Sequence, residues 1–289
     1  MLILVDCNHL CHIQMNRFRG FVNSKGKATG VLFGFMRELL VLAQAFDSTE
    51  FAFVWDSRKS LRKLYYSGYK DRREVEKTPQ DVRDERDGFK QFEELKDMVL
   101  PRLGFKNIFF QEGIEADDII ARICKTYPNR QVVILSNDND LWQLLSKNHY
   151  MYSVKSKRKY TAEDFEGEWG LPPGRWAEVK AIAGCSGDKV KGVPGVGNKS
   201  AAQYLKGALK EHYKTYKNIT STAGKRIAKY NKFLVTLPLP ATDYFRLSKE
   251  VEEKFRLEDF LYFWDEYEFN SLKAQEALWR ERFNMRVGR

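Results

Sequence analysis

Carboxylate side chains gather between residues 113 and 145, at points where the backbone is expected to turn. Some of them open a helical apolar pattern, where the positive end of the helix dipole tolerates negative charge. Others follow the β-branched run 132–135, which is typical of a buried parallel strand. The residues concerned are Glu115, Asp117, Asp118, Asp138 and Asp140.

Two further apolar runs, 2–6 and 51–56, are short strands that end in Asp6 and Asp56. In an open parallel α/β sheet, ligands bind outside the carboxyl ends of the strands. A single aspartate at a strand end is ordinarily a turn former or a helix cap. The coincidence of so many acids at such ends favours instead one shared acidic crevice.

An acidic crevice of this kind needs cations, because its carboxylates would otherwise repel one another and raise one another's pKa. The ligands are hard oxygen donors, and no histidine or cysteine stands at metal-binding spacing, so Mg²⁺ or Mn²⁺ is expected. Two such ions about 4 Å apart would suit phosphodiester hydrolysis, in which they neutralise the attacking and leaving oxygens.

Composition and charge indicate the partner. The chain has 289 residues, 43% of them hydrophobic, and a formal net charge of +10. A basic surface around an acidic site favours a polyanion that is bound broadly and cut locally, although a merely basic soluble protein is the alternative. Asp6 interrupts the first apolar run and no run could span a membrane, so we expect no targeting segment and no membrane partner. The four cysteines follow no disulfide or zinc pattern, which favours a reducing cytoplasm.

The segment 58–73 is rich in arginine and lysine with tyrosines interleaved, a composition typical of single-strand binding surfaces. A solvated basic helix face is the alternative. An amphipathic helix from about Asp81 to Leu100 follows and should stop at Pro101. Because this insertion of about 45 residues is longer than an ordinary βα connection, we predict a lid or gateway over the acidic site.

A second informative stretch is the glycine-rich turn from Gly192 to Gly197 within residues 180–202, followed by Lys199. Such a turn between helices exposes backbone amides to a DNA phosphate, although a plain connector is equally common. After the break at Leu171 the chain is predicted to be helical to its end. The aromatic residues from Phe233 to Phe283 are predicted to pack in a core.

These segments, taken together, resemble the flap endonuclease and 5′ to 3′ exonuclease family of phages and bacteria, which includes the 5′ nuclease domain of DNA polymerase I. The resemblance covers about residues 1–205. It is carried, in the family's order, by LVDCN, FVWD, the pattern from Arg62 to Arg73, GIEADD, LSNDNDLWQLL and GDKVKGVPGVGNKSAA.

The resemblance implies an α/β fold with a parallel-sheet, PIN-like nuclease core over 1–160. A helical arch is inserted at about 57–100, and a helical DNA-binding region over 161–289 contains a helix-hairpin-helix at about 180–205. It also implies a Mg²⁺-dependent or Mn²⁺-dependent enzyme that uses two ions and binds a potassium ion at the hairpin. Its partners would be DNA with 5′ ends, flaps or junctions, or RNA primers on DNA. We expect a monomer, in a bacterial cell or a phage-infected host.

By matching positions, the resemblance assigns residues of this chain to three sets: ligands of a first metal ion, ligands of a second metal ion, and DNA contacts. The first group is Asp6, Asp56, Glu115, Asp117, Asp118 and Asp138. The second is Asp138, Asp140 and Asp188. Lys70 and Arg73 match arch residues that steer the scissile phosphate, Tyr69 a base-stacking position and Lys180 a lysine near the active site. With Lys70 and Arg73, the predicted DNA contacts are Arg58, Arg62, Tyr69, Lys180, Gly192, Gly195, Gly197 and Lys199.

The chain departs from the family at one ligand position. The family has Gly-Asp-x-x-Asp before the hairpin, whereas this chain has Gly184-Cys185 followed by Asp188. A neutral thiol is a poor Mg²⁺ ligand, so we predict that the second site binds metal more weakly.

Two other functions compete with a 5′ nuclease. One is a ribonuclease or phosphatase on a related acidic fold. An aspartyl-phosphatase would need an acid two residues after the first aspartate, where this chain has Asn8. The other is a DNA-junction binder whose catalysis is impaired by Cys185, which would bind flaps in EDTA without turnover in Mn²⁺.

Overall fold

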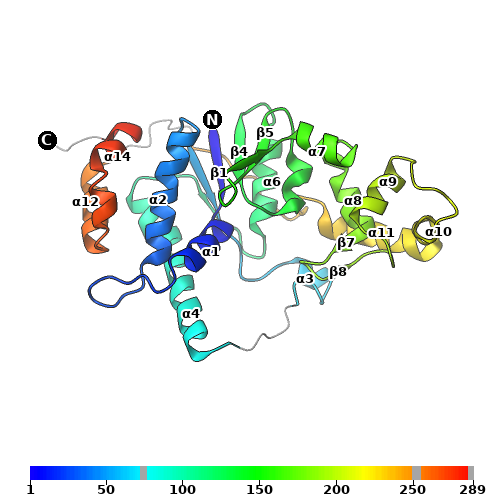
Figure 1. The fold of residues 1–289 in the computed structure, drawn as a ribbon, viewed down its shortest axis with the longest axis horizontal. Coiled ribbons are helices and arrows are strands. Elements are labelled where there is room, and N and C mark those ends of the chain that lie inside the picture. The colour runs from blue at the N-terminus through cyan, green and yellow to red at the C-terminus, as the bar shows by residue number, and fades with distance from the viewer. Residues whose placement is uncertain (72–76, 249–254, 286–289) are drawn as a thin grey trace. The chain divides into compact units, whose positions relative to one another are not determined.

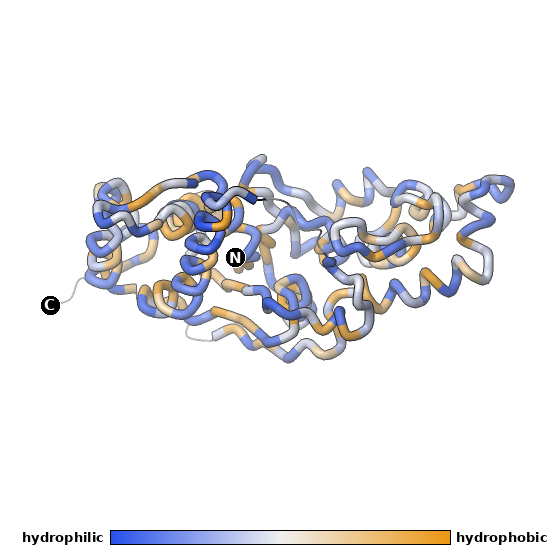
Figure 2. The backbone as a smooth tube through the Cα atoms, turned by 90° about the horizontal axis from the view of Figure 1, so that it is seen from below, coloured by the Kyte–Doolittle hydropathy of each residue, from blue (hydrophilic) through white to orange (hydrophobic). Residues whose placement is uncertain are grey.

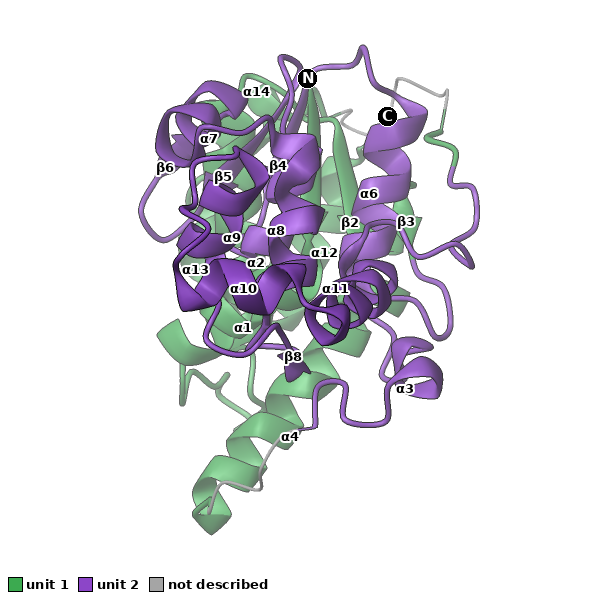
Figure 3. Cartoon of the chain, turned by 90° about the vertical axis from the view of Figure 1, so that its right-hand side faces the viewer, with its two compact units in different colours: residues 1–55, 75–109, 246–289 green, residues 56–74, 110–245 purple. Residues whose placement is uncertain are grey.

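The computed structural model describes residues 1–71, 77–248 and 255–285. The chain divides into two compact units (Figure 3). Unit 1 comprises 1–55, 75–109 and 246–289, and unit 2 comprises 56–74 and 110–245. The functional division predicted at residue 160 is a different partition of the chain, and it stays a prediction.

Unit 1 contains parallel strands in which β2 pairs with both β1 and β3. These strands are β1 (Leu2–Asp6), β2 (Phe51–Val54) and β3 (Ile108–Phe109). Both β1 and β2 are buried along their whole length, which explains why their sequences are continuously apolar rather than alternating. The register pairs Asp6 with Val54, so Asp6 lies at the carboxyl end of β1.

The helices of unit 1 come from all three of its segments (Figure 1). The predicted helix ending at Pro101 is present but continues to Arg102. A π-helical turn interrupts the regular hydrogen-bond ladder just before Pro101, where the proline ring would clash with an α-helical carbonyl. The elements are α1 (Cys7–Arg17), α2 (Gly30–Ala45), α4 (Pro79–Glu94), the π-helix η1 (Leu95–Val99), α5 (Leu100–Arg102), α12 (Leu257–Glu266), α13 (Asn270–Lys273) and α14 (Glu276–Arg282).

Unit 2 has its own strands. β4 (Val132–Leu135) pairs in parallel with β5 (His149–Ser153), which pairs antiparallel with β6 (Arg158–Tyr160). Taken with unit 1, the strands are mostly parallel and alternate with helices, which confirms the predicted α/β class.

Most of unit 2 is helical. Its helices are α3 (Arg62–Tyr65), α6 (Ala116–Thr126), the 3₁₀ helices η2 (Asn139–Leu144) and η3 (Pro173–Arg175), α7 (Ala162–Trp169), α8 (Trp176–Ala183), α9 (Asn198–Leu205), α10 (Lys214–Thr220) and α11 (Thr222–Val235). The short strands β7 (Gly184–Cys185) and β8 (Val190–Lys191) form a hairpin between α8 and α9. Along these helices hydrophilic and hydrophobic residues alternate, as expected where one face of a helix is buried (Figure 2).

The prediction that the chain is helical to its end is wrong for residues 236–248, which form no helix. Pro238 and Pro240 lack the backbone N–H that a helix requires. The segment is bonded to α6 instead. Lys125 Nζ donates to the Leu237 carbonyl at 2.9 Å, and Arg122 Nη2 donates to that of Thr242 at 2.9 Å.

Most of the late aromatic residues are buried, as predicted, including Phe260, Trp264 and Trp279. Phe233, Tyr244 and Tyr262 are exposed exceptions. Across the described residues, no helix is both long enough and apolar enough to cross a membrane.

Candidate active site

The N-terminus of α6 brings together three of the predicted carboxylates, Asp56, Glu115 and Asp117. Glu115 is the N-cap residue, with extended backbone, and Asp117 lies in the first turn. The Ala116 N–H donates to Asp56 Oδ1 at 2.7 Å, so Asp56 satisfies one of the amides that a helix start leaves unpaired. The acids are therefore held here by the helix itself, as the sequence pattern predicts.

Lys70 lies among these acids and links them to Asp188. Its Nζ is 3.1 Å from Glu115 Oε1 and 3.8 Å from Asp188 Oδ1. Its backbone N–H donates to the Asp188 carbonyl at 2.9 Å, which holds Lys70 in the left-handed region at φ 49°. Burial would lower the pKa of Lys70, but the negative charges of Glu115, Asp188, Asp117 and Asp56 outweigh it and raise that pKa. The ammonium is therefore charged, yet its side chain is 38% exposed and can be reached by a ligand.

A second acidic group is formed by two segments. One lies between β4 and η2, and the other is the hairpin that follows α8. Asp138 caps η2 by accepting the Asp140 N–H at 2.8 Å. The possible ligand atoms of Asp140, Cys185 and Asp188 all lie within 4.8 Å of one another. Burial and then the charge of Asp140 raise the pKa of Asp138. Burial raises the pKa of Asp188 as well, against the opposing effect of Lys70. The second group is thus crowded with like charge, as a cation site would be.

Cys185 and Lys180 contact the same carboxylate of this group. Burial, followed by the charges of Asp140 and Asp188, raises the pKa of the Cys185 thiol to about 12. The thiol is therefore protonated at neutral pH, and it donates to Asp140 Oδ2 at 3.4 Å. Lys180 Nζ lies 2.7 Å from Asp140 Oδ1 and donates to Asn139 Oδ1 at 2.8 Å. Nothing in the sequence marked Asn139 as a partner of Lys180, because only the fold brings η2 and α8 together.

Arg62 and Asp118 form an internal ion pair. Arg62 is 2% exposed and Asp118 is completely buried. Nη1 and Nη2 donate to the two Asp118 oxygens at 2.5 and 2.7 Å, Nε donates to the Leu234 carbonyl at 2.8 Å, and the Leu239 N–H also donates to Asp118. In this structure the Arg62 guanidinium is enclosed and both Asp118 oxygens are engaged, so we assign neither residue to the proposed site, and their roles as a DNA contact and a metal ligand stay predictions.

Tyr69, predicted to stack on a base, is buried as well. Its side chain is 2% exposed and packs in a buried cluster with Ala181, Val190 and Leu234. Its hydroxyl donates to Glu115 Oε2 at 2.8 Å. The ring therefore presents no free face on which a base could stack in this structure, and Tyr69 instead helps to orient Glu115.

The remaining predicted site residues are placed as follows. Asp6 lies in unit 1, where its Oδ1 accepts the His9 N–H at 3.0 Å and so caps α1. Its membership of the acidic group stays a prediction. Arg58 is exposed in unit 2. Arg73 lies outside the described residues, and the predicted arch includes segments of both units.

The glycine-rich turn forms the hairpin predicted between two helices, here α8 and α9. Gly184, at φ 82°, lies directly against Gly192, and a Cβ on Gly192 would come within 2.1 Å of the Ala183 carbonyl. Glycine is required for this close backbone approach. Gly195 and Gly197 are exposed in the turn between β8 and α9, and Lys199 is exposed in the first turn of α9.

The sequence of this chain is similar to those of known proteins. A sequence profile described as "5′-3′ exonuclease, N-terminal resolvase-like domain" matches residues 1–170. The thermostable DNA polymerase I of Thermus aquaticus is 31% identical over 207 residues, which are 71% of this chain and 23% of that protein. The 5′-3′ exonuclease of Buchnera aphidicola is 26% identical over 209 residues, covering 71% of this chain and 69% of that protein. The chain thus spans less than a quarter of the length of the polymerase relative.

Solved structures share the fold. A bacteriophage T5 flap endonuclease in a pseudo-enzyme-product complex with DNA and metal ions has a TM-score of 0.68 at 23% identity, covering 81% of this chain and 88% of that one. The catalytic core of Rad2 in complex with DNA substrate has a TM-score of 0.56 at 18% identity, covering 97% and 91%.

Proposed function

We propose that this chain, which belongs to the 5′-3′ exonuclease family, is a structure-specific 5′ nuclease that hydrolyses DNA phosphodiesters at 5′ ends and flap junctions. The observation that carries the proposal is the position of Lys70. Its charged, reachable ammonium lies against Glu115 and Asp188, which belong to two different acidic groups. Removal of flaps or primers during replication is the role that such an activity would serve.

The donor set fits divalent cations. Asp56, Glu115 and Asp117 would serve one ion, and Asp138, Asp140 and Asp188 another. Apart from the protonated Cys185 these are all carboxylate oxygens, the donors that Mg²⁺ and Mn²⁺ prefer. When bound, such ions supply Lewis-acid neutralisation of the phosphate and activation of water.

Lys70 would bind a non-bridging oxygen of the scissile phosphate. Its backbone is fixed by the Asp188 carbonyl, so the ammonium is positioned before the substrate arrives. Preorganised positive charge of this kind stabilises the charge that develops in a phosphoryl-transfer transition state. Arg73 is proposed to assist, as the family pattern implies.

The hairpin between α8 and α9 would hold the duplex. Gly195, Gly197 and Lys199 are exposed and can offer backbone amides and a cation to phosphates without reading base sequence. The potassium ion predicted at this hairpin stays a prediction, as do RNA primers as substrates.

Cys185 and Lys180 should weaken the second ion site. The thiol contributes no negative charge, and the Lys180 ammonium already neutralises Asp140. We therefore propose that Asp138 and Asp188 carry most of the affinity of this site, and that it fills only at higher Mg²⁺ concentrations than the first.

The test is cleavage of a labelled 5′-flap duplex with Mg²⁺ by the full chain, by Asp138→Asn and by Asp259→Asn. Asp259 is a carboxylate on α12 that has no part in the proposed site and serves as the matched control. We expect cutting near the junction by the wild-type chain and the control, and at least a 100-fold loss in Asp138→Asn.

Three outcomes would refute the proposal. Undiminished cutting by Asp138→Asn would remove that carboxylate from the chemistry. Tight flap binding in EDTA with no turnover in Mg²⁺ or Mn²⁺ would support the junction-binding alternative, and preferential cutting of RNA would support a ribonuclease.

A further inference from the structure

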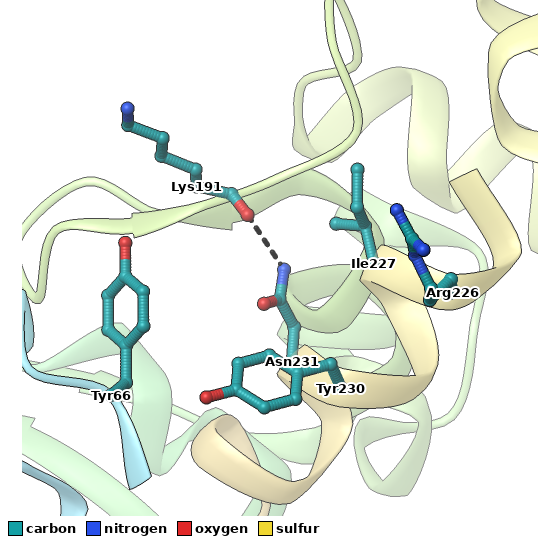
Figure 4. A pocket seen from close by; sticks show the side chains of 6 residues that line it. All are labelled: Tyr66, Lys191, Arg226, Ile227, Tyr230 and Asn231. Atoms are coloured by element: carbon teal, nitrogen blue, oxygen red, sulfur yellow. Dashed lines mark hydrogen bonds between the residues drawn. The ribbon is translucent and has the colours of Figure 1, made fainter. Parts of the chain in front are cut away.

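A pocket of about 410 Å³ opens in unit 2, outside the acidic groups (Figure 4). This volume lies within the roughly 300–1,000 Å³ range of small-ligand sites. Its walls come from the residue after α3, from β8 and from α11. The lining residues are Tyr66, Lys191, Arg226, Ile227, Tyr230 and Asn231.

Asn231 forms the floor of the pocket and offers it a free acceptor. Its Nδ2 donates to the carbonyls of Ala181 at 3.1 Å and Lys191 at 2.9 Å. Because both partners are carbonyl oxygens, the amide nitrogen must face them and Oδ1 must face away. Figure 4 shows Oδ1 directed to the side where Tyr66 lies. Asn231 is only 4% exposed, and no donor among the described residues bonds this oxygen.

Two tyrosines supply aromatic surface. The rings of Tyr66 and Tyr230 have centroids 6.5 Å apart and planes at 70°. Both hydroxyls are anchored, since Tyr66 donates to the Lys189 carbonyl at 3.2 Å and Tyr230 donates to the Tyr65 carbonyl. The rings are therefore held in place, while Tyr230 remains 48% exposed and available to a ligand.

Two cations, Lys191 and Arg226, line the pocket. Within the part of the chain that the structure describes, neither Lys191 nor Arg226 has a carboxylate within ion-pair distance. Positive charge beside aromatic surface is the combination that binds unpaired nucleotides, because the cations take the phosphate and the rings take the base.

The pocket is joined to the proposed active site by short stretches of chain. Tyr66 precedes Lys70 in the same segment, whose backbone is bonded to that of Asp188. β8, which carries Lys191, pairs with β7, which carries Cys185. A strand bound at the pocket would therefore lie on the same unit as the acidic groups.

We propose that this pocket binds one unpaired nucleotide of the DNA substrate. The base packs against Tyr66 and Tyr230, and Asn231 Oδ1 accepts a hydrogen bond from an exocyclic amino group. Arg226 and Lys191, which lie apart in Figure 4, bind the phosphates on either side of this nucleotide. The identity of the substrate rests on the proposed function. Cytosine, adenine and guanine carry an exocyclic amino group, whereas thymine offers only its ring N3–H, so the pocket should favour the three amino bases over thymine.

The experiment measures binding of labelled duplexes to the full chain by fluorescence anisotropy in EDTA, so that no cleavage occurs. The duplexes carry a 5′ flap, a 3′ flap or no flap, and the flaps are oligo-dC or oligo-dT. The variants are Arg226→Ala, Tyr230→Leu and Tyr230→Phe. The matched controls are Lys225→Ala, which removes a cation from the same helix outside the pocket, and Tyr262→Leu, which removes a tyrosine that is 52% exposed in unit 1.

We expect Tyr230→Leu to weaken binding of flapped duplexes about tenfold, and Tyr230→Phe, which keeps the ring, to retain it. Arg226→Ala should weaken binding and lower the salt dependence by about one phosphate contact. The wild-type chain should bind an oligo-dC flap about two- to tenfold more tightly than an oligo-dT flap. None of these differences in affinity should appear with the duplex that has no flap. If they appear only with the 5′-flap or only with the 3′-flap duplex, that result identifies the strand that the pocket binds.

Equal losses in Tyr230→Leu and Tyr262→Leu, or equal losses in Arg226→Ala and Lys225→Ala, would overturn the pocket assignment. Equal affinity for oligo-dC and oligo-dT flaps would overturn the Asn231 contact. Effects of the same size on the duplex without a flap would show a general duplex contact instead. The proposed function is tested separately: if it is wrong, the wild-type chain will not cleave the flap duplex in Mg²⁺, whatever the binding measurements show.

Discussion

Replacing Arg62 should destabilise unit 2 rather than impair DNA binding directly. The basic composition of segment 58–73 predicted an exposed cation, but the structure buries this one between α6 and the end of α11. Arg62→Met keeps most of the length and the apolar stem of the side chain while removing its charge. The change therefore tests the charge with little loss of packing.

The size of the effect follows from what Arg62 leaves behind. Without it, Asp118 loses both guanidinium bonds, Glu115 loses a contact at 3.3 Å, and the Leu234 carbonyl loses its donor at 2.8 Å. Breaking a buried pair by removing one partner costs about 3–5 kcal/mol, because the remaining charge is buried and uncompensated. For a chain of this size that corresponds to a fall in Tm of about 6–20 °C.

The assay is urea unfolding followed by circular dichroism, with hydrogen exchange of α6 and α11 to locate the loss. Lys63→Met is the matched control, since Lys63 is the next residue of α3 and is exposed. It should change the free energy of unfolding by less than about 0.5 kcal/mol. The double variant Arg62→Met with Asp118→Leu should recover part of the loss, because no buried charge is left alone.

The reasoning would be refuted by an Arg62→Met protein as stable as the wild-type chain. A specific loss of DNA affinity with unchanged unfolding would restore the original prediction of a DNA contact.

Three further predictions follow from particular side chains. Cys185→Asp restores a carboxylate beside Asp140 and Asp188, so the Mg²⁺ concentration for half-maximal cleavage should fall several-fold; an unchanged Mg²⁺ titration would show that the thiol does not limit the second site. Burial raises the pKa of Cys124 from 9.0 to about 12, so above pH 9 the unfolded chain loses this proton first and stability should fall between pH 9 and 12. Thermal melts of Cys124→Ala should show a shallower fall over that range, and an identical slope would contradict the assignment. Gly192→Ala places a Cβ 2.1 Å from the Ala183 carbonyl and should weaken duplex binding by opening the hairpin, whereas Gly187→Ala, which meets nothing within 4 Å, should bind normally. Equal binding by the two variants would refute the hairpin's role.

The acids at the start of α6 could be predicted from sequence because their placement is local. Glu115 and Asp117 fall at the first turn of a helix whose apolar pattern is plain, and the aspartate after a buried strand must lie near such a turn in an α/β fold. The structure adds the bond from the Ala116 amide to Asp56, which depends on residues 60 apart in the chain.

Burial of Arg62 and Tyr69 could not be predicted, because it depends on distant partners. The acceptor of the Arg62 Nε bond, the Leu234 carbonyl, is 172 residues away. Composition alone predicts that a basic, tyrosine-containing segment faces solvent, and it cannot show which of its members turn inward to neutralise buried carboxylates.

The role of Asn231 in the pocket could not be predicted from the sequence either. Asn231 is one polar residue in an amphipathic helix, and its role depends on carbonyls of α8 and β8 that face it. The absence of a helix over 236–248 could have been predicted, because Pro238 and Pro240 flank a single leucine and exclude a helix.

The central claim is that the carboxylates gathered in unit 2 hold divalent cations for phosphodiester hydrolysis. Its most direct test is a crystal grown with Mn²⁺ and measured at the manganese absorption edge. The account predicts anomalous peaks within about 2.0–2.4 Å of carboxylate oxygens of Asp138 and Asp188 and of the group formed by Asp56, Glu115 and Asp117. Peaks confined to other surfaces, with both groups bound only to Lys70 and Lys180, would contradict it.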